Sequence, residues 1–275
     1  MITMNNFFDI KPAYIDNNGV EYTTEQLLDM VSDWEDPNPK PVIEEHDGFQ
    51  VVRDDLLDVG SKMRFVDKFI RDTKAKEIVF GSCPATGYAQ ISLPAVCNKY
   101  GKKTILFMAK RNEENLHEYQ IRGRDLGAEY RWVNMGMLTV TQHRARKYYE
   151  EDTDNRVLFP IGLEHPSVVG SIIKVARQLP IKPKEVWSVG SSGTLNRGLQ
   201  LAFPDAEINV VSVGHKMSDR EIGRANFYKS EYPFYKPCKD DEKPPFPSAP
   251  TYDAKAWKFI KKHGSKGALF WNVGA

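Results

Sequence analysis

Several features that often reveal a function are scarce in this sequence. Its 275 residues include only Cys83, Cys97 and Cys238, and this odd, widely spaced set predicts neither a disulfide framework nor a zinc site. The six histidines have no metal-ligand spacing, so we predict no metal. The formal net charge is only +1, which gives no indication that nucleic acid or an anionic membrane is a partner.

Targeting signals are scarce as well. The sequence has no apolar run long enough to span a bilayer, and residues 1–9 lack the basic and apolar regions of a signal peptide. With 41% hydrophobic and 27% charged residues, the composition is that of an ordinary globular protein. We therefore expect a cytoplasmic protein with reduced thiols, built as one large domain or two modest ones.

Strands and helices alternate along most of the chain. A polar arm over residues 1–22 leads to a helix capped by Thr23 or Thr24, and short strands are expected at 42–43 and 49–52. The main alternation places strands at 77–80, 104–108, 130–133, 185–189, 208–213 and 268–271, and helices at 88–100, about 116–126, 140–151, 167–179, 194–202 and about 252–263. This rhythm predicts an α/β fold with parallel sheets covered by helices.

Two further segments have two interpretations each. The proline-rich residues 229–251 are either a flexible linker or an ordered surface loop. The strand near 185–189 is followed by a turn and then a helix, and a helix start of this kind offers free backbone N–H groups to an anion such as phosphate. The turn consists of Gly190, Ser191, Ser192, Gly193 and Thr194. Its glycines would equally serve only to turn the chain.

Lys62 is the main candidate for covalent chemistry. It follows Gly60 and Ser61 at a predicted helix start, where little side-chain bulk precedes it. A buried lysine has a lowered pKa, so its neutral amine can form a Schiff base. The alternative is an ordinary solvated lysine on a helix.

The residues around Lys62 resemble a known pattern. Residues 52–56 read Val-Arg-Asp-Asp-Leu and residues 60–64 read Gly-Ser-Lys-Met-Arg. This resembles the Schiff-base lysine segment of fold type II pyridoxal-phosphate enzymes, the tryptophan synthase β superfamily. It is most similar to the branch of aminocyclopropane-carboxylate deaminase and D-cysteine desulfhydrase, although Ser61 replaces the usual asparagine. The resemblance extends from about residue 40 to the C-terminus, through residues 79–108, 126–131, 190–194, 250–255 and 269–274.

The resemblance implies a fold, a cofactor and a set of site residues. It implies two lobes, each with a mainly parallel sheet flanked by helices: a larger phosphate-binding lobe of residues 1–65 and 153–275, and a smaller inserted lobe of residues 66–152. It implies pyridoxal phosphate bound to Lys62, with residues 190–194 around the phosphate. Further cofactor contacts are expected from Thr86, Gly87, Tyr88 and Asn272.

Some family positions are changed in this chain. Tyr88 replaces the asparagine that contacts the phenolic oxygen of the cofactor, so either its hydroxyl donates there or its ring stacks nearby. Gly87 replaces the deaminase serine, and Val273, beside Asn272, replaces the partner of the pyridine nitrogen. The family places a substrate-side tyrosine at Tyr252, for which the alternative is a core aromatic. The expected catalytic residues are thus Lys62, Tyr88 and Tyr252.

The implied activity is a pyridoxal-phosphate-dependent lyase, deaminase or β-replacement reaction on a small amino acid, with a homodimer as one expectation. One alternative is a divergent enzyme of this type that acts on an amino acid linked to a carrier or nucleotide. A second is a phosphoribosyltransferase-like enzyme, since Asp54, Asp55 and Asp58 precede Gly60 somewhat as in that family's diphosphate-sugar motif. A third is a non-catalytic binding protein of the pyridoxal-phosphate fold.

Overall fold

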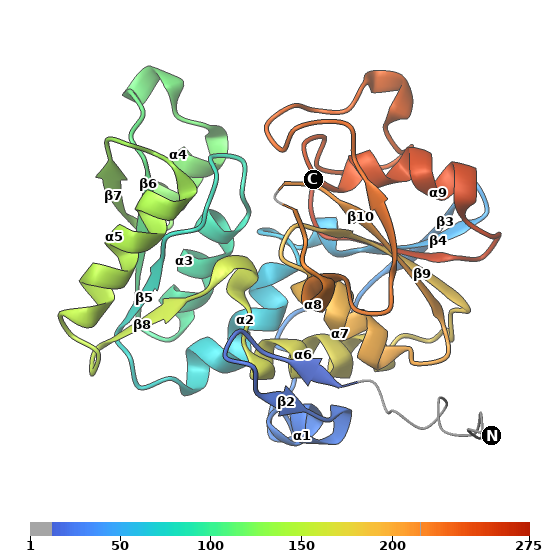
Figure 1. Cartoon of the computed structure of the whole chain (residues 1–275), viewed down its shortest axis with the longest axis horizontal. Coiled ribbons are helices and arrows are strands. Elements are labelled where there is room, and N and C mark those ends of the chain that lie inside the picture. The colour runs from blue at the N-terminus through green and yellow to red at the C-terminus, as the bar shows by residue number, and fades with distance from the viewer. Residues whose placement is uncertain (1–12, 215) are drawn as a thin grey trace, which may run out of the picture.

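The chain forms two lobes, each built on its own β-sheet. The computed structural model describes residues 13–214 and 216–275, and Figure 1 shows the two lobes side by side. The predicted arm lies partly outside these residues, and its described end forms a short antiparallel pair, β1 (Tyr14–Ile15) and β2 (Glu21–Tyr22). Thr23 caps α1 (Thr24–Asp29) through a reciprocal bond with Gln26, as the sequence predicts.

The larger lobe contains a six-stranded sheet in the order β11-β10-β9-β12-β4-β3. All neighbours pair in parallel except β3 and β4, which form an antiparallel hairpin. The turn between them holds Asp47 and Gly48 at positive φ, the conformation that a tight hairpin requires. The strands are β3 (Ile43–His46), β4 (Phe49–Arg53), β9 (Glu185–Gly190), β10 (Glu207–Ser212), β11 (Asn226–Lys229) and β12 (Leu269–Asn272).

Helices cover both faces of this sheet. Alternate side chains of a strand point to opposite faces, so Val186 packs with α6 (Pro166–Arg177) and α7 (Thr194–Ala202). Its neighbour Trp187 packs with α9 (Trp257–His263) on the other face. Because every residue of β9 is buried, this strand forms the centre of the larger lobe.

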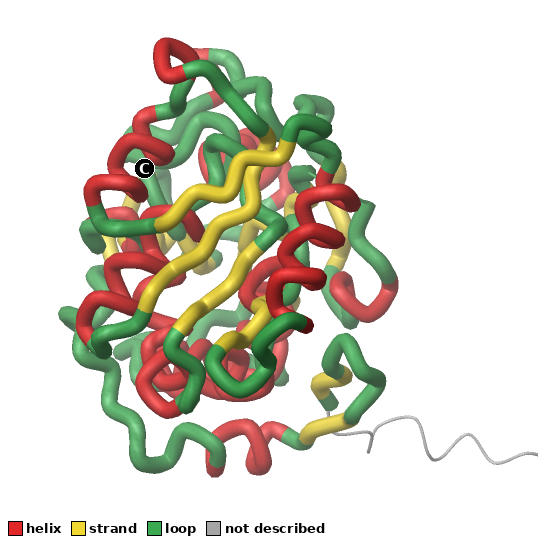
Figure 2. Tube along the Cα trace, turned by 90° about the vertical axis from the view of Figure 1, so that its left-hand side faces the viewer, coloured by secondary structure: helices red, strands yellow, loops and turns green. Residues whose placement is uncertain are grey.

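The smaller lobe contains a four-stranded parallel sheet in the order β7-β6-β5-β8. Figure 2 faces this lobe and shows the strands running side by side. Ile78 belongs to the buried cluster of α3 (Ala89–Lys99), and Val79 to that of α5 (Leu138–Glu150). α4 (Glu118–Asp125) packs on α3. The strands are β5 (Glu77–Phe80), β6 (Lys103–Ala109), β7 (Glu129–Val133) and β8 (Arg156–Phe159).

The structure confirms the α/β class and the two mainly parallel sheets, but it adds two strands. β8 is only half-buried and β11 is mostly exposed at a sheet edge, so neither has a strong apolar pattern. β8 pairs with β5 in the smaller sheet, although it follows the predicted boundary at residue 152. The predicted helix at 252–263 begins with a 3₁₀ turn, Asp253–Ala256, before α9. The division of residues between the lobes stays a prediction.

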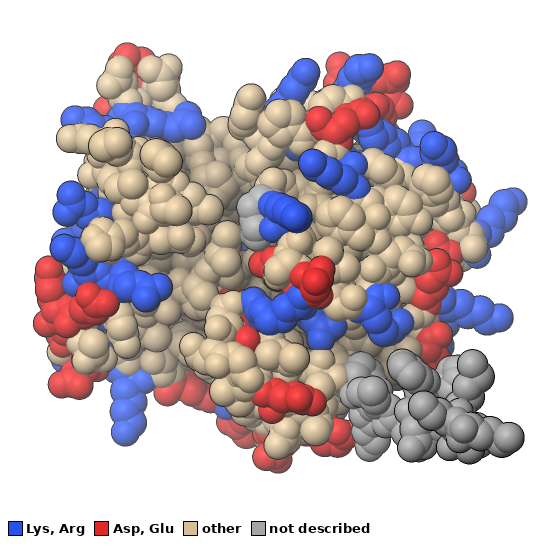
Figure 3. All heavy atoms as spheres, in the orientation of Figure 1, with Lys and Arg blue, Asp and Glu red and all other residues tan. Residues whose placement is uncertain are grey.

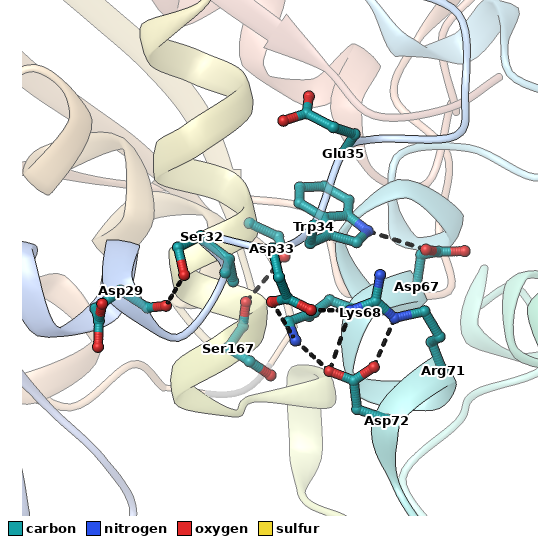
Figure 4. A network of polar contacts seen from close by, with 12 residues as sticks. Asp29, Ser32, Asp33, Trp34, Glu35, Asp67, Lys68, Arg71, Asp72 and Ser167 are labelled. Atoms are coloured by element: carbon teal, nitrogen blue, oxygen red, sulfur yellow. Dashed lines mark hydrogen bonds and ion pairs between the residues drawn. The ribbon is translucent and has the colours of Figure 1, made fainter.

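Helix α2 (Lys62–Asp72) joins the two lobes, since it packs against α3 on one side and α6 on the other. Figure 4 shows its outer face, where Lys68 and Arg71 form ion pairs with both Asp33 and Asp72. The loop that follows α1 is thereby tied to α2. The first residue of α2, Lys62, is held where the lobes meet.

The segment over residues 229–251 packs on the larger lobe as a surface loop. Tyr232, Cys238 and Phe246 are buried in it, and Phe246 contacts Trp257 of α9. Of the two interpretations of this segment, the structure shows the ordered one. The remaining short helices are α8 (Asp219–Ile222) and the 3₁₀ turns Asp54–Leu56, Glu113–Asn115, Ile161–Leu163 and Asp240–Glu242. Within residues 13–214 and 216–275, none of the helices combines the length and the apolar character needed to cross a membrane.

Candidate active site

A cavity of about 460 Å³ lies between the two lobes, where Figure 3 shows a hollow in the surface. Residues predicted for the site line it from both lobes: Lys62, Thr86, Gly87, Tyr88, Ser191, Ser192 and Tyr252. A second cavity of about 60 Å³ shares Lys62 and Ser191 with the first and continues along Gly190, Ser192, Gly193 and Thr194. The structure therefore places Lys62 and residues 190–194 in one continuous space.

A tight turn positions Lys62. Gly60 has φ 73, and a Cβ there would lie 2.7 Å from the Val273 carbonyl oxygen and 3.0 Å from the Tyr88 ring. The Ser61 N–H donates to the same Val273 oxygen at 2.9 Å. Only glycine fits such a close approach at positive φ, so the turn presses the start of α2 against the end of β12.

Behind Lys62, the buried carboxylate of Asp54 braces the turn. It accepts hydrogen bonds from Ser61 Oγ at 2.8 Å, Trp271 Nε1 at 2.9 Å and Arg64 Nη2 at 3.2 Å. Burial raises the pKa of Asp54, while Arg64 and the two neutral donors oppose that shift. The serine at position 61 therefore has a structural role, since its hydroxyl satisfies an acid that would otherwise be underbonded.

The Lys62 amine has properties of a nucleophile. Burial lowers its pKa, although Asp253 and Cys83 act in the opposite direction. Among the residues that the structure describes, none accepts a hydrogen bond from Lys62 Nζ. Burial raises the pKa of the neighbouring Cys83 thiol to about 12, so this thiol is protonated at neutral pH. Lys62 is therefore the better candidate for covalent chemistry.

The turn between β9 and α7 has the features of an anion site. Gly193 is the N-cap of α7 with φ 76 and makes no side-chain cap bond. A Cβ on Gly193 would lie 2.5 Å from the Glu221 carbonyl oxygen, so glycine is required here. In the described part of the chain, nothing accepts from the backbone N–H groups of Ser192, Gly193 or Thr194. These donors stand at the positive end of α7 beside the smaller cavity.

Tyr88 faces the cavity from the smaller lobe, immediately before α3. Its hydroxyl donates to the Ala275 carbonyl oxygen at 2.5 Å and accepts from Tyr119 Oη at 3.0 Å. Burial raises the pKa of Tyr88. Because the single hydroxyl proton is used within the protein, the ring of Tyr88, rather than its proton, is presented to a ligand. Of the two predicted roles, the structure is compatible with the stacking role.

Comparison with solved structures identifies the fold. An ACC deaminase homologue matches with a TM-score of 0.76 and 15% identity, over 90% of this chain and 94% of that chain. Threonine deaminase isoform 2 from Solanum lycopersicum, in its processed form, matches with a TM-score of 0.69 and 14% identity over 96% and 86% of the two chains. For maize serine racemase the TM-score is 0.64 and the identity 11%, over 96% and 94%. This chain has the fold of the fold type II pyridoxal-phosphate enzymes.

One relative is similar in sequence as well. The glycyl-dTMP PLP-dependent decarboxylase of Pseudomonas phage M6 is 26% identical over 211 residues, which are 65% of this chain and 75% of that protein. Comparison with protein-family models gives no match. The predicted resemblance to fold type II enzymes is thus confirmed for the fold.

Within this fold type II chain, Tyr252 lines both cavities, and its hydroxyl donates to the Val189 carbonyl oxygen at 3.3 Å. Its ring also packs at the edge of the core beside Phe234, with ring centroids 6.1 Å apart. Burial raises the pKa of its hydroxyl. Both interpretations of Tyr252 are therefore compatible with the structure, because its side chain lines the cavities and also packs against the core.

Asn272 does not line either cavity. Its side-chain amide donates to Asp55 Oδ1 at 2.8 Å and to the Pro247 carbonyl oxygen at 2.9 Å. Its Oδ1 accepts from Ser248 Oγ at 2.8 Å. The side chain is fully buried and its bonds are used structurally, while the next residue, Val273, lines the cavity. The predicted cofactor contact of Asn272 has no support in this geometry.

Asp253 is a candidate that sequence reasoning missed. It is fully buried next to Tyr252 in the chain, and neither carboxyl oxygen has a hydrogen-bond partner of good geometry among the described residues. Burial raises its pKa well above the usual range, opposed by Lys62 and by the backbone amides of Val273 and Gly274. A buried acid with no side-chain partner, whose charge acts on the lysine, is a typical sign of a functional site, although Asp253 itself lines neither cavity. Its position directly after Tyr252 was the available signal.

The described residues contain no group of three or more His, Cys, Asp or Glu side chains that could hold a metal ion. His215, one of the six histidines considered in the sequence, lies outside them.

Proposed function

We propose that this protein is a pyridoxal-phosphate-dependent enzyme that decarboxylates an amino acid attached to a nucleotide. The observation that carries cofactor dependence is the shared cavity: an unpaired Lys62 amine at one place and the free N–H groups of residues 192–194 at another. The similarity to the glycyl-dTMP decarboxylase supports the choice of reaction and substrate.

The residues present fit this cofactor. The N–H groups of Ser192, Gly193 and Thr194 and the positive end of α7 would hold its phosphate. Lys62 Nζ would bind its aldehyde carbon. Asp253 lines neither cavity, but its buried carboxyl acts electrostatically on Lys62, so it would tune the lysine amine from behind the cavity wall. Val273, which lines the cavity, can neither donate a side-chain hydrogen bond to the ring nitrogen nor accept one from it.

When bound, pyridoxal phosphate withdraws electrons from the α-carbon of an amino acid, so that a bond to that carbon can break. Lys62 would then deliver or remove a proton at the α-carbon, since burial lowers the pKa of its amine. Tyr88 and Val273 both line the cavity, and their apolar surface would limit access of water.

A second candidate is the predicted lyase, deaminase or β-replacement reaction on a small free amino acid. The fold shared with an ACC deaminase homologue and a threonine deaminase favours it. The glycine at position 87, where the deaminases have a serine, and the engagement of Tyr88 with the Ala275 carbonyl oxygen argue against deamination.

The phosphoribosyltransferase alternative loses its basis in the structure. Asp54 is buried behind the Lys62 turn, with its oxygens bonded to protein donors. Asp55 binds Arg53 at 2.8 Å and accepts from Asn272. These acids are therefore not available for the hydroxyls of a ribose diphosphate.

Spectroscopy combined with a product assay tests the proposal. The purified protein loaded with pyridoxal phosphate should absorb at about 410–430 nm, the range of a lysine-bound cofactor. With a glycyl-linked thymidine monophosphate it should release carbon dioxide, whereas release of ammonia from free amino acids would favour the second candidate. Lys62→Ala should lose both the absorption and turnover, while Lys74→Ala, an exposed control, should keep them. A normal absorption without any turnover would favour the non-catalytic alternative.

A further inference from the structure

Gln120 is a buried donor left without a partner at the wall of the larger cavity. It is only 2% exposed and lines the cavity from α4. Its Oε1 accepts from the His117 N–H at 3.0 Å in the capping box that starts α4. This bond fixes which way the amide points, because only the oxygen can accept. The other end, Nε2, has no hydrogen-bond partner among the described residues.

A free cation lies on the same wall. Arg111 follows β6, is exposed and lines the cavity. Its contact within the protein is a long one, from Nη1 to the Asn115 carbonyl oxygen at 3.4 Å. Over residues 13–214 and 216–275, no carboxylate forms an ion pair with Arg111. By contrast Arg124, on α4, is paired with Glu113 at 2.9 Å.

The surfaces near these two groups are apolar. Leu138 lines the cavity from the smaller lobe and Phe234 lines it from the larger lobe. Met135 and Met137, in the loop before α5, are 67% and 63% exposed. A ligand suited to this combination has a flat, partly apolar body, an acceptor oxygen and a negative charge.

We infer that Gln120 and Arg111 form the subsite that holds the nucleotide part of the substrate. Gln120 Nε2 would donate to a carbonyl oxygen of a pyrimidine base, and Arg111 would pair with its phosphate at the open edge of the cavity. This inference rests on the proposed function, because the amino acid attached to that base must reach Lys62 in the same cavity. The chemistry is the same for a free nucleotide and for a nucleotide within DNA.

Matched variants separate the two contacts. Gln120→Glu keeps an oxygen for the His117 N–H, so α4 keeps its cap, but it removes the amide donor. Arg111→Ala removes the cation from an exposed position with little effect on folding. Arg124→Ala is the control, because it removes a neighbouring paired arginine that does not line the cavity.

Calorimetric titration of the pyridoxal-phosphate-loaded protein with thymidine monophosphate and with thymidine tests the subsite. Arg111→Ala should weaken binding of the monophosphate about tenfold or more and leave the affinity for thymidine unchanged. Gln120→Glu should weaken binding of thymidine about tenfold and binding of the monophosphate at least as much, because the added acid also repels its phosphate. Arg124→Ala should change neither. Equal affinities in the wild type and in the Arg111 and Gln120 variants, or no binding of the monophosphate by the wild type, would overturn the inference.

Two further readings identify the source of the ligand and guard against a trivial failure. A thymidine-containing single-stranded oligonucleotide that binds more tightly than the monophosphate, and loses this advantage in Arg111→Ala, would identify DNA. Tighter binding of the monophosphate would identify the free nucleotide. The absorption at about 410–430 nm is recorded for every variant. Its retention without nucleotide binding rejects the subsite alone, whereas its absence in the wild type rejects the proposed function.

Discussion

The two walls of the cavity differ in how their polar groups are paired. On the larger-lobe wall, no described residue accepts from Lys62 Nζ or from the N–H groups of residues 192–194, and the carboxyl of Asp253 lies behind this wall without a side-chain partner. On the smaller-lobe wall, Tyr88 binds Ala275. Behind this wall, Gln90 Nε2 donates to the Ala85 and Gly87 carbonyl oxygens at 2.6 and 3.0 Å. Unpaired groups are available for chemistry, whereas paired groups hold a shape.

This contrast separates the expected effects of mutations. Changes to the unpaired polar groups of the larger-lobe wall should affect the cofactor and turnover more than stability. Changes to the paired groups of the smaller-lobe wall should affect stability first, whereas the unpaired Gln120 and Arg111 on that wall should affect ligand binding.

The largest effect is expected for Asp253→Asn. This nearly isosteric change removes the buried carboxyl that acts on Lys62, so turnover should fall about tenfold or more. Stability should be unchanged or higher, because a buried, unpartnered carboxyl no longer has to be accommodated. Steady-state kinetics and thermal unfolding measure the two quantities on the same sample. Unchanged turnover would show that the acid has no role in the reaction.

Gly193→Ala should come next, with Gly87→Ala as its counterpart on the other wall. Alanine at φ 76, with its Cβ 2.5 Å from the Glu221 oxygen, should lower the free energy of unfolding by at least about 2 kcal/mol and weaken cofactor binding. At Gly87 the nearest atoms are Cys83 Sγ and Pro84 Cδ, both at 3.0 Å, and φ is not positive. The effect there should be smaller, as urea unfolding and cofactor titration can show. Equal losses at both glycines would show that the positive φ and the close contact of Gly193 do not set it apart from Gly87.

The stability of the protein is expected to depend on pH through His165, which lies where α6, α2 and β8 meet. His165 caps α6, and its ring lies 4.4 Å from Phe69, which packs 4.5 Å from Phe159 of β8. Burial lowers the pKa of His165 from 6.5 to about 4. Between these values the unfolded chain binds a proton that the folded chain does not, so stability should fall as the pH drops through this window.

The loss due to His165 should reach about 2 kcal/mol by about pH 5. His165→Asn keeps a capping side chain and should remove this part of the loss. Urea unfolding at about pH 7 and about pH 5 compares the two proteins. The same loss in both would assign it to other groups.

The smallest effect is expected for Tyr88→Phe. It removes the hydrogen bond to Ala275 and the one from Tyr119, at a cost of about 1 kcal/mol, and leaves the ring in the cavity. The absorption of the bound cofactor should therefore be unchanged. Tyr235→Phe, whose side chain is 78% exposed, is the control and should have no effect. A large loss of turnover with normal stability would instead assign the hydroxyl to the reaction.

Much of the fold was predictable from the sequence. Apolar alternation placed the strands of both sheets except β8 and β11, and the predicted helix at 194–202 has the bounds of α7. The missed strands have few buried residues, so their positions depend on pairing with distant strands rather than on their own pattern.

The site residues also fall into two groups, those that a local sequence pattern reveals and those that depend on distant neighbours. Lys62 and residues 190–194 stand beside glycine turns that short sequence patterns reveal, so the sequence by itself determined them as candidates. The tertiary structure decided the rest, because pairing between distant segments left Asp253 and Gln120 unpaired and used up Asn272 on Asp55. Whether a polar group is satisfied depends on neighbours contributed from elsewhere in the chain, and no local pattern records them.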